Sequence, residues 1–204
     1  MEPSAHVDTF ARDNLPPQDQ WPVFLLDNPD VAYPARFNCA TELLDTNIEA
    51  GHRDRPAIWS DVDGKPQATT YGELLALVNR SAHVLVDEMG LQPGNRVLLR
   101  GPNTLHMAVT ALAALKAGLV VVPTMPLLRA KELKQIIEKA QVSAALCDAR
   151  LTDELARCNN PQDEFYCAGL KQTRLFHDDS ADSLDTLAIT ATAESRRDGR
   201  LRKR

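Results

Sequence analysis

The nine glycines of this 204-residue sequence are dispersed, and this limits the ways in which the chain can hold a phosphate group. Backbone N–H groups approach a phosphate closely where glycines gather at a strand-to-helix turn. Neither G-x-G-x-x-G nor G-x-x-x-x-G-K-[ST] occurs in the sequence. The serine motif G-x-S-x-G is also absent. These absences disfavour an ordinary dinucleotide fold, a P-loop and a strand-end serine nucleophile.

No two of the four cysteines have C-x-x-C spacing. The N-terminal residues MEPSAHVDTFARD lack a basic segment followed by an apolar run, so no secretory signal is predicted. Reduced thiols in the cytoplasm are then the simplest interpretation. A zinc site built from Cys147, Cys158, Cys167 and His177 fits no standard ligand spacing, so no metal site is predicted.

The sequence also lacks an unbroken apolar stretch of membrane-spanning length. Its longest apolar region, Leu105–Leu128, is interrupted by Lys116, Gly118, Pro123 and Pro126. A membrane span needs about 20 mostly apolar residues. The region therefore predicts a buried helix followed by a buried strand, with no membrane span.

The net charge of −5 conceals an asymmetry. Residues 196–204 read RRDGRLRKR and hold six basic residues, which leaves a net charge of −10 on the rest of the chain. Phosphate backbones require a basic surface, so the acidic body argues against nucleic acid as a partner. Residues 188–204 are interpreted as an aberrant basic tail that we expect to be disordered.

Hydrophobic periodicity predicts an α/β domain over residues 38–187, after an extended arm over residues 1–37 with too few periodic apolar positions for a helix. The predicted helices span residues 38–50, 70–89, 104–117, 130–140 and 152–158. The predicted strands span residues 57–61, 67–70, 96–100, 119–123, 143–147 and 173–176, and the first two form a hairpin. This alternation is typical of a doubly wound, mainly parallel sheet with flanking helices. Strand 119–123 is apolar on both faces, which predicts a central position.

Two residues are weak candidates for cofactor binding, because open α/β sheets bind ligands at the carboxyl ends of their strands. His106 lies in the first turn after strand 96–100, but no carboxylate or second ligand is recognisable beside it, so a structural role is favoured. Arg129 follows the strand-end segment PTMPLL and could contact an anionic ligand or offset the acidic body.

Other polar residues predict structural roles. His83 shares a helical turn with Asn79 and Asp87, which indicates a solvated face. Asp61 and Asp63 bracket the hairpin turn and are interpreted as turn residues, not as metal ligands. No catalytic residue is predicted from the residue patterns.

Two segments in the expected order resemble core motifs of adenylate-forming enzymes. The segment TTYGELLALVNRSAHVL (69–85) resembles the first motif, a helix opened by Thr-Tyr-x-Glu-Leu. The segment LAALKAGLVVVPTMPLL (112–128) resembles the second, Leu-Lys-Ala-Gly followed by an apolar strand and proline. Between them GNRVLLRGPN (94–103) occupies the place of the family's intervening strand. The resemblance implies the N-terminal part of the adenylate-forming fold.

Three further segments resemble one branch of that family, the benzoate– and 2-aminobenzoate–CoA ligases. They are AHVDTFARDNLPP (5–17), YPARFNCATELLD (33–45) and VVPTMPLLRAKEL (121–133). The resemblance extends from about residue 5 to about residue 187 and implies a two-step reaction. An aromatic carboxylic acid attacks ATP to give an acyl adenylate and pyrophosphate, and the thiol of CoA then displaces AMP. Mg²⁺ would offset phosphate charge.

The sequence also departs from this family. The family's Ser/Thr/Gly-rich loop ending in Pro-Lys is not found where the chain reads ITATAESRRDGRLRKR (189–204). The lysine of the family's C-terminal domain has no counterpart, since Lys203 stands in no matching context. We therefore expect a truncated ligase, through a frameshift or early stop near residue 188, that is inactive alone.

Two other functions remain open at this point. The chain could be a non-enzymatic interaction module, either as a homo-oligomer or as one half of a split ligase with a complementing chain. It could also be an unrelated nucleotide-binding α/β domain, although the missing glycine-rich turn argues against this.

Overall fold

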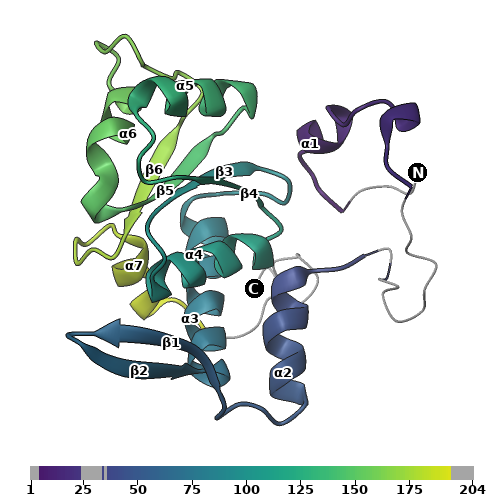
Figure 1. Cartoon of the computed structure of the whole chain (residues 1–204), viewed down its shortest axis with the longest axis vertical. Coiled ribbons are helices and arrows are strands. Elements are labelled where there is room, and N and C mark those ends of the chain that lie inside the picture. Colours follow the sequence, from purple (N-terminus) through teal and green to yellow (C-terminus); the bar gives the residue numbers. More distant parts are fainter. Residues whose placement is uncertain (1–4, 24–33, 35, 194–204) are drawn as a thin grey trace.

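A computed structural model of the chain describes residues 5–23, 34 and 36–193. Its main sheet has four parallel strands in the order β4-β3-β5-β6 (Figure 1). These strands are β3 (Arg96–Arg100), β4 (Val120–Thr124), β5 (Ala144–Asp148) and β6 (Gln172–Phe176). A separate antiparallel hairpin consists of β1 (Pro56–Val62) and β2 (Lys65–Thr70). The predicted α/β class, the parallel sheet and the hairpin are confirmed.

Helices connect the strands. The α-helices are α1 (Phe10–Asp13), α2 (Thr46–Glu49), α3 (Tyr71–His83), α4 (Leu105–Lys116), α5 (Ala130–Lys139), α6 (Thr152–Asn159) and α7 (Leu184–Thr190). Two π-helical segments, η3 (Thr41–Asp45) and η4 (Val84–Glu88), precede α2 and extend α3, and two 3₁₀ turns are η1 (Gln18–Gln20) and η5 (Ala149–Leu151). Within the described residues, no helix has the length and apolar character needed to cross a membrane.

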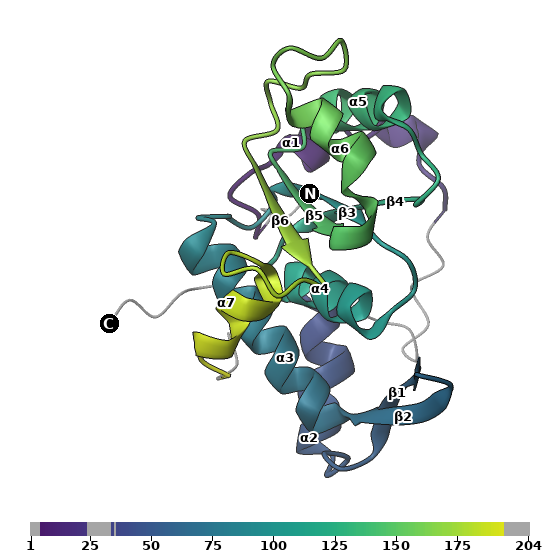
Figure 2. The same ribbon diagram turned by 90° about the vertical axis from the view of Figure 1, so that its left-hand side faces the viewer.

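The sheet lies between two helical layers, with α3, α4 and α7 on one face and α5 and α6 on the other (Figures 1 and 2). Side chains alternate between the two faces of a strand, so neighbouring residues enter different cores. In β3, Leu99 joins the core beneath α3 and α4, whereas Leu98 joins the core beneath α5 and α6. Every residue of β3 and β5 is buried, as expected for strands covered on both sides.

The prediction that strand 119–123 is central is wrong for the part of the chain that the structure describes. There β4 pairs with β3 alone, and its first three residues are only partly buried. Pro123 was the sequence signal, because proline cannot donate a ladder hydrogen bond and is confined mostly to edge strands. The strand is apolar but lies at the edge.

Helix starts follow the expected capping residues. The Thr70 side chain accepts a hydrogen bond from the Glu73 amide at 3.3 Å, and the Glu73 carboxylate accepts one from the Thr70 amide at 2.8 Å. Asn38 caps the helical turn that leads into η3, since its Oδ1 accepts from the amide of Thr41 at 3.1 Å. In the β1–β2 turn, Asp61 accepts from the amide of Gly64 at 2.8 Å, which confirms its turn role.

The helical segments α1, η1 and α7 were not predicted from the sequence. Two short ones, α1 and η1, interrupt residues 5–23, which we call the N-terminal arm. The other, α7, begins at Ser183, whose hydroxyl accepts from the amide of Thr186 at 3.1 Å, and it packs against α3. The proposed domain boundary at residue 187 falls within this helix, and the basic segment 196–204 lies outside the described residues.

The N-terminal arm is held at the amino edge of the sheet. Its Asp8 carboxylate accepts hydrogen bonds from the guanidinium of Arg96 and from Asn95 at 2.9 Å. Burial alone would raise the pKa of Asp8, but hydrogen bonds from Arg96, Phe10 and Asn95 outweigh it and hold that pKa below its ordinary value. Gly94 has φ of +92°, and a Cβ there would lie 2.1 Å from the carbonyl oxygen of Asp8.

Candidate functional site

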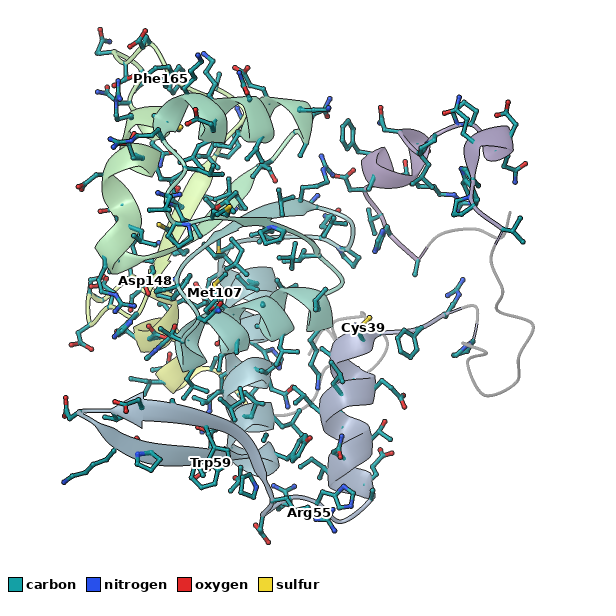
Figure 3. The ribbon with its side chains drawn as sticks, viewed as in Figure 1. Cys39, Arg55, Trp59, Met107, Asp148 and Phe165 are labelled. Atoms are coloured by element: carbon teal, nitrogen blue, oxygen red, sulfur yellow. The ribbon has the colours of Figure 1, made fainter. Side chains whose placement is uncertain are left out.

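The carboxyl edge of the sheet gathers the last residues of all four strands, and three of these residues are polar. Because the strands are parallel, their last residues, Arg100, Thr124, Asp148 and Phe176, lie at the same edge. Asp148 is labelled in Figure 3, and so is Met107 from the first turn of α4, which packs at this edge. The side chain of Asp148 and that of Arg100 are both buried. This edge is therefore the candidate functional site.

Arg100 holds two loops of the site. Its guanidinium donates to the carbonyl oxygens of Met125, Pro126 and Leu128 in the β4–α5 loop, at 3.0, 2.8 and 3.0 Å. It also donates to the carbonyl oxygen of Leu151 after β5, at 3.2 Å. The donors of this buried cation are thus used by main-chain acceptors. Sequence reasoning missed this role, although an arginine that ends an otherwise apolar strand was a signal.

Asp148 ends β5 and is fully buried. Both of its oxygens pair with the guanidinium of Arg150 at 2.8 Å, and one also accepts from the Arg150 amide at 3.0 Å. The hydrogen bond from Arg150 is the largest cause that holds the pKa of Asp148 below its ordinary value, against the opposing effect of burial. This carboxylate stays charged at neutral pH and fixes the turn after β5.

His106 has partners that the sequence did not reveal. Its ring stacks on that of His177, with centroids 4.5 Å apart and planes 6° from parallel. His177 follows β6, and its Nδ1 lies 3.5 Å from Asp148 Oδ2. The sequence showed no recognisable partner for His106, because His177 and the carboxylate beside His177 arrive from distant strands of the sheet.

Arg129 starts α5, and its side chain is 79% exposed. Its Nη1 lies 3.3 Å from Glu154 Oε1, while the other oxygen of Glu154 accepts from the Ala130 amide at 2.9 Å. The hydrogen bond from Ala130 is the first cause that lowers the pKa of Glu154. A carboxylate of the protein thus occupies the start of α5, where an anionic ligand would otherwise find free N–H groups.

The helical starts at this edge carry caps supplied by the protein. At each start after β3, β4 and β5, one backbone amide donates to a side-chain oxygen. Thr104 accepts from the Met107 amide at 3.2 Å, Glu154 from that of Ala130, and Asp148 from that of Arg150. These caps and the main-chain acceptors of Arg100 fix the loops at this edge.

The zinc alternative from Cys147, Cys158, Cys167 and His177 is not assembled. No group of three His, Cys, Asp or Glu side chains in the described ranges could hold a metal ion. The Cys147 thiol donates instead to main-chain carbonyl oxygens, and burial raises its pKa to about 12. Cys147 is thus a neutral core residue at physiological pH.

The second core motif is a structural joint. Lys116 is buried, and its ammonium pairs with the carboxylate of Asp45 on η3. Burial lowers the pKa of Lys116, and the hydrogen bond and charge of Asp45 oppose that change. Asn38 adds donations to the carbonyl oxygens of Leu115 and Lys116, at 3.1 and 3.2 Å. The motif lysine therefore fastens the segment before the hairpin to α4.

The predicted solvated face of α3 is only half correct. His83 pairs with Asp87 at 3.1 Å across one turn. Asn79 is buried, and its Nδ2 donates to the carbonyl oxygen of Ala193 at 2.9 Å. The partner of Asn79 is 114 residues away in sequence, so the local pattern could not reveal it.

A pocket lies at the amino edge of the sheet, opposite the candidate functional site. It has a volume of about 420 Å³ and is lined by the end of α5, the turn between α5 and β5, and the loop before β6. Its lining residues are Ile137, Glu138, Gln141, Val142, Cys167 and Gly169. This pocket therefore lies at the other edge of the sheet from Asp148, at the end of β5, and from His106, at the start of α4.

The two core motifs thus belong to one structural unit. The first supplies α3, which follows the hairpin, and the second supplies the end of α4 and strand β4 of the parallel sheet. Residues 45–200 match the model of the family described as AMP-binding enzyme. The chain belongs to the AMP-binding enzyme family. Membership sets aside the alternative of an unrelated nucleotide-binding domain.

Known members of the AMP-binding enzyme family show the extent of this similarity. The uncharacterized acyl–CoA ligase YtcI of Bacillus subtilis is 30% identical over 122 residues, which cover 60% of this chain and 22% of YtcI. The benzoate–CoA ligase of Thauera aromatica is 30% identical over 123 residues, covering 60% of this chain and 23% of that enzyme. The chain thus spans less than a quarter of the length of these relatives.

The fold is also similar to that of a solved structure. ATP-bound MatB from Rhodopseudomonas palustris superposes with a TM-score of 0.59 at 25% identity, over 77% of this chain and 28% of MatB. This agreement supports the interpretation of the sheet and its helices as the N-terminal part of the adenylate-forming fold.

Proposed function

We propose that these residues form the N-terminal structural part of an ATP-dependent acid–CoA ligase that acts in the cytoplasm with Mg²⁺. The observation that carries the proposal is the family match over residues 45–200, together with relatives that are themselves acyl–CoA ligases. In the overall reaction an acid, ATP and CoA would give an acyl–CoA, AMP and pyrophosphate. The part described here supplies the sheet, the joint at Lys116 and the ordered carboxyl edge.

The proposed substrate class is an aromatic carboxylic acid. Segments 5–17, 33–45 and 121–133 resemble the benzoate– and 2-aminobenzoate–CoA ligases, and a benzoate–CoA ligase is among the relatives. Acyl–CoA and acetyl–CoA synthetases match at comparable identity, so the aromatic class rests on those segments.

We further propose that the 204-residue chain does not form an adenylate unaided. The sequence contains no glycine-rich loop ending in Pro-Lys, and the helix starts at the carboxyl edge are capped by the protein itself. Purified chain should show no ATP–pyrophosphate exchange with benzoate or 2-aminobenzoate. Turnover that follows the protein through purification would contradict this proposal.

A chimera tests the positive part of the proposal. Residues 38–187 would replace the matching segment of the Thauera aromatica benzoate–CoA ligase, and benzoyl–CoA formation would be measured. We expect activity above that of the ligase with the segment deleted. A folded chimera with no activity, while the parent ligase works in the same assay, would argue for a non-catalytic role.

The second candidate function is an interaction module, including one half of a split ligase. Met125 and Leu127 at the carboxyl edge are 64% and 84% exposed, and β4 has an open side among the described residues. Exposed apolar residues beside an open strand edge favour association. Size-exclusion chromatography would measure self-association, and co-expression with the adjacent coding sequence would test for a complementing chain. A monomer in both experiments would rule this candidate out.

A further inference from the structure

Cys158 and Cys167 are neighbours in space on the α5–α6 side of the sheet. Cys158 lies near the end of α6, and Cys167 lies in the loop that leads to β6. Both are buried, and the backbone N–H of Cys167 donates to the carbonyl oxygen of Cys158 at 2.9 Å. The Cys158 thiol donates to the carbonyl oxygens of Ala130 and Glu154, at 3.6 and 3.8 Å, and the Cys167 thiol donates to that of Phe165 at 3.4 Å.

This arrangement satisfies the geometry of a cross-link without a large backbone movement. An N···O contact of 2.9 Å between the two residues keeps their Cα atoms within about 6.8 Å of each other, given standard covalent dimensions. Disulfides in proteins usually join Cα atoms about 4.4–6.8 Å apart. Only side-chain rotation and a small backbone adjustment would be required to bring the sulfurs into bonding distance.

We propose that Cys158 and Cys167 are an oxidation site, where a small hydroperoxide converts the two thiols into a reversible disulfide. The site is independent of the proposed ligase function, because it lies on the other side of the sheet from the α3–α4 core and near its amino edge. Phe165, in the loop between the two cysteines, marks its place at the opposite end of the molecule from Trp59 of the hairpin (Figure 3).

The pocket of about 420 Å³ gives an oxidant a route to one of the two sulfurs. Cys167 lines that pocket, whereas Cys158 does not. The pocket wall next to Cys167 leaves free space, because a Cβ added at Gly169 would meet no atom within 4 Å. A hydroperoxide is small enough for a hollow of this size, so Cys167 is the first sulfur that it meets.

Electrostatics assign the same order to the two thiols. Burial raises the pKa of Cys158 to about 12. Burial also raises the pKa of Cys167, and the neighbouring Cys158 side chain opposes this rise. The thiolate is the nucleophile, so Cys167 attacks and Cys158 resolves, and the reaction is slow at neutral pH and faster at alkaline pH.

The chemistry balances in two steps. The sulfur of Cys167 attacks one peroxide oxygen, so an S–O bond forms, the O–O bond breaks, and the thiol proton leaves with the released alcohol or water. This gives a sulfenic acid at Cys167. The sulfur of Cys158 then attacks that sulfur, an S–S bond forms, and the S–O bond breaks with release of water. Two thiols are oxidised and one hydroperoxide is reduced.

The disulfide would fix the loop that runs over residues 159–166. That loop is already attached by Arg157, whose Nε donates to Asp163 at 2.9 Å, and by Lys134, which donates to the carbonyl oxygens of Glu164 and Tyr166. Closing a short covalent loop reduces the freedom of the unfolded chain. Oxidation should therefore raise the melting temperature and hold one wall of the pocket in place.

The chain contains a matched control. Cys147 is buried like Cys158, and burial raises its pKa to about 12 as well. Its thiol donates to the carbonyl oxygens of Asp148 and Leu151 and is not paired with another thiol. Cys39 provides the opposite control, an exposed thiol. Proximity alone thus distinguishes the proposed pair from Cys147.

Peptide mapping of the wild-type chain tests the proposal. The native protein is treated with tert-butyl hydroperoxide, alkylated in denaturant and digested with trypsin. Peptide 158–171 contains both cysteines of the pair, peptide 140–150 contains Cys147 alone, and peptide 37–53 contains Cys39 alone. We expect peptide 158–171 to lose two hydrogen masses and to resist alkylation until a dithiol reductant is added. Peptide 140–150 should remain fully alkylated.

Two outcomes would overturn the proposal. One is that peptide 158–171 is alkylated at both cysteines under conditions that oxidise Cys39. The other is that Cys158 or Cys167 is found bonded to a different cysteine. In Cys158→Ala a dimedone adduct should accumulate at Cys167, whereas Cys167→Ala should leave Cys158 unmodified, and the reverse pattern would refute the assigned order. The wild-type digest decides the pairing even where a variant fails to fold.

Discussion

The buried pair of Lys116 and Asp45 provides the sharpest test of the idea that the second core motif is structural. The Lys116 side chain is fully buried, whereas that of Asp45 is 14% exposed. Burial lowers the pKa of Lys116, and Asp45 counteracts this effect. Asp45 is thus the group that allows an ammonium to remain in the core, and Asp45→Ala should expose how strongly the fold depends on it.

The expected magnitudes differ between the two partners. Loss of one partner of a buried ion pair costs about 3–5 kcal/mol, and Asp45→Ala leaves the fully buried ammonium alone. Lys116→Met leaves a carboxylate that can still reach water, so it should cost less, about 1–3 kcal/mol. The double variant removes the orphaned charge and should be more stable than Asp45→Ala alone.

Urea unfolding followed by tryptophan fluorescence measures these differences, with the unfolding slope checked for a constant value. Glu42→Ala is the matched control, because Glu42 is an exposed carboxylate on the same π-helical segment as Asp45, and it should change stability by about 0.5 kcal/mol or less. The reasoning is refuted if Asp45→Ala unfolds at the same urea concentration as the wild type. It is also refuted if the double variant is no more stable than Asp45→Ala.

The remaining predictions concern the arm, a helix cap and the acid response. Gly94→Ala should detach the N-terminal arm and destabilise the chain by more than about 1 kcal/mol, because Gly94 has φ of +92° and the new Cβ would clash with Asp8. Faster proteolysis of the arm and a lower midpoint of urea unfolding would show this effect. Thr70→Ala removes the cap of α3 and should cost about 1 kcal/mol in urea unfolding, with no change in slope. Asp148 has a folded-state pKa below its ordinary 3.8, so its stabilising effect is present above pH 3.8 and is lost as the pH falls through the lower folded value. Melting temperatures measured at decreasing pH should therefore fall less steeply for Asp148→Asn than for the wild type.

Local patterns in the sequence predicted most of the sheet and its connecting helices. The capping box at Thr70 and the glycine after α4 are short-range signals, and the helices that they delimit were placed within one or two residues. Strand β3 was placed at its observed bounds, Arg96–Arg100, because an apolar run between a turn and a glycine leaves little alternative. Helix α7 was missed although Leu184, Leu187 and Ala188 have helical spacing, because it is only seven residues long and lies within an acidic segment.

The parts of the candidate site that were missed depend on long-range contacts. His106 gained its stacking partner only because β6 ends at the same edge as β3, which brings His177 beside it, and Asp148 at the end of β5 lies next to His177. The position of β4 at the edge is likewise a property of strand order, which hydrophobicity does not encode. Asn79 illustrates the same limit, since its partner Ala193 lies 114 residues away in sequence, after the end of α7.

At the carboxyl edge, the buried polar residues of the described chain have structural roles. Arg100 is the cation best placed to meet a ligand, yet its donors bind four main-chain carbonyl oxygens. These bonds hold the β4–α5 and β5–α6 loops at fixed positions before any ligand arrives. Glu154 similarly satisfies the start of α5. These contacts therefore position the loops of the edge. The groups that this edge still presents to a ligand are the exposed side chain of Arg129 and the stacked pair of His106 and His177.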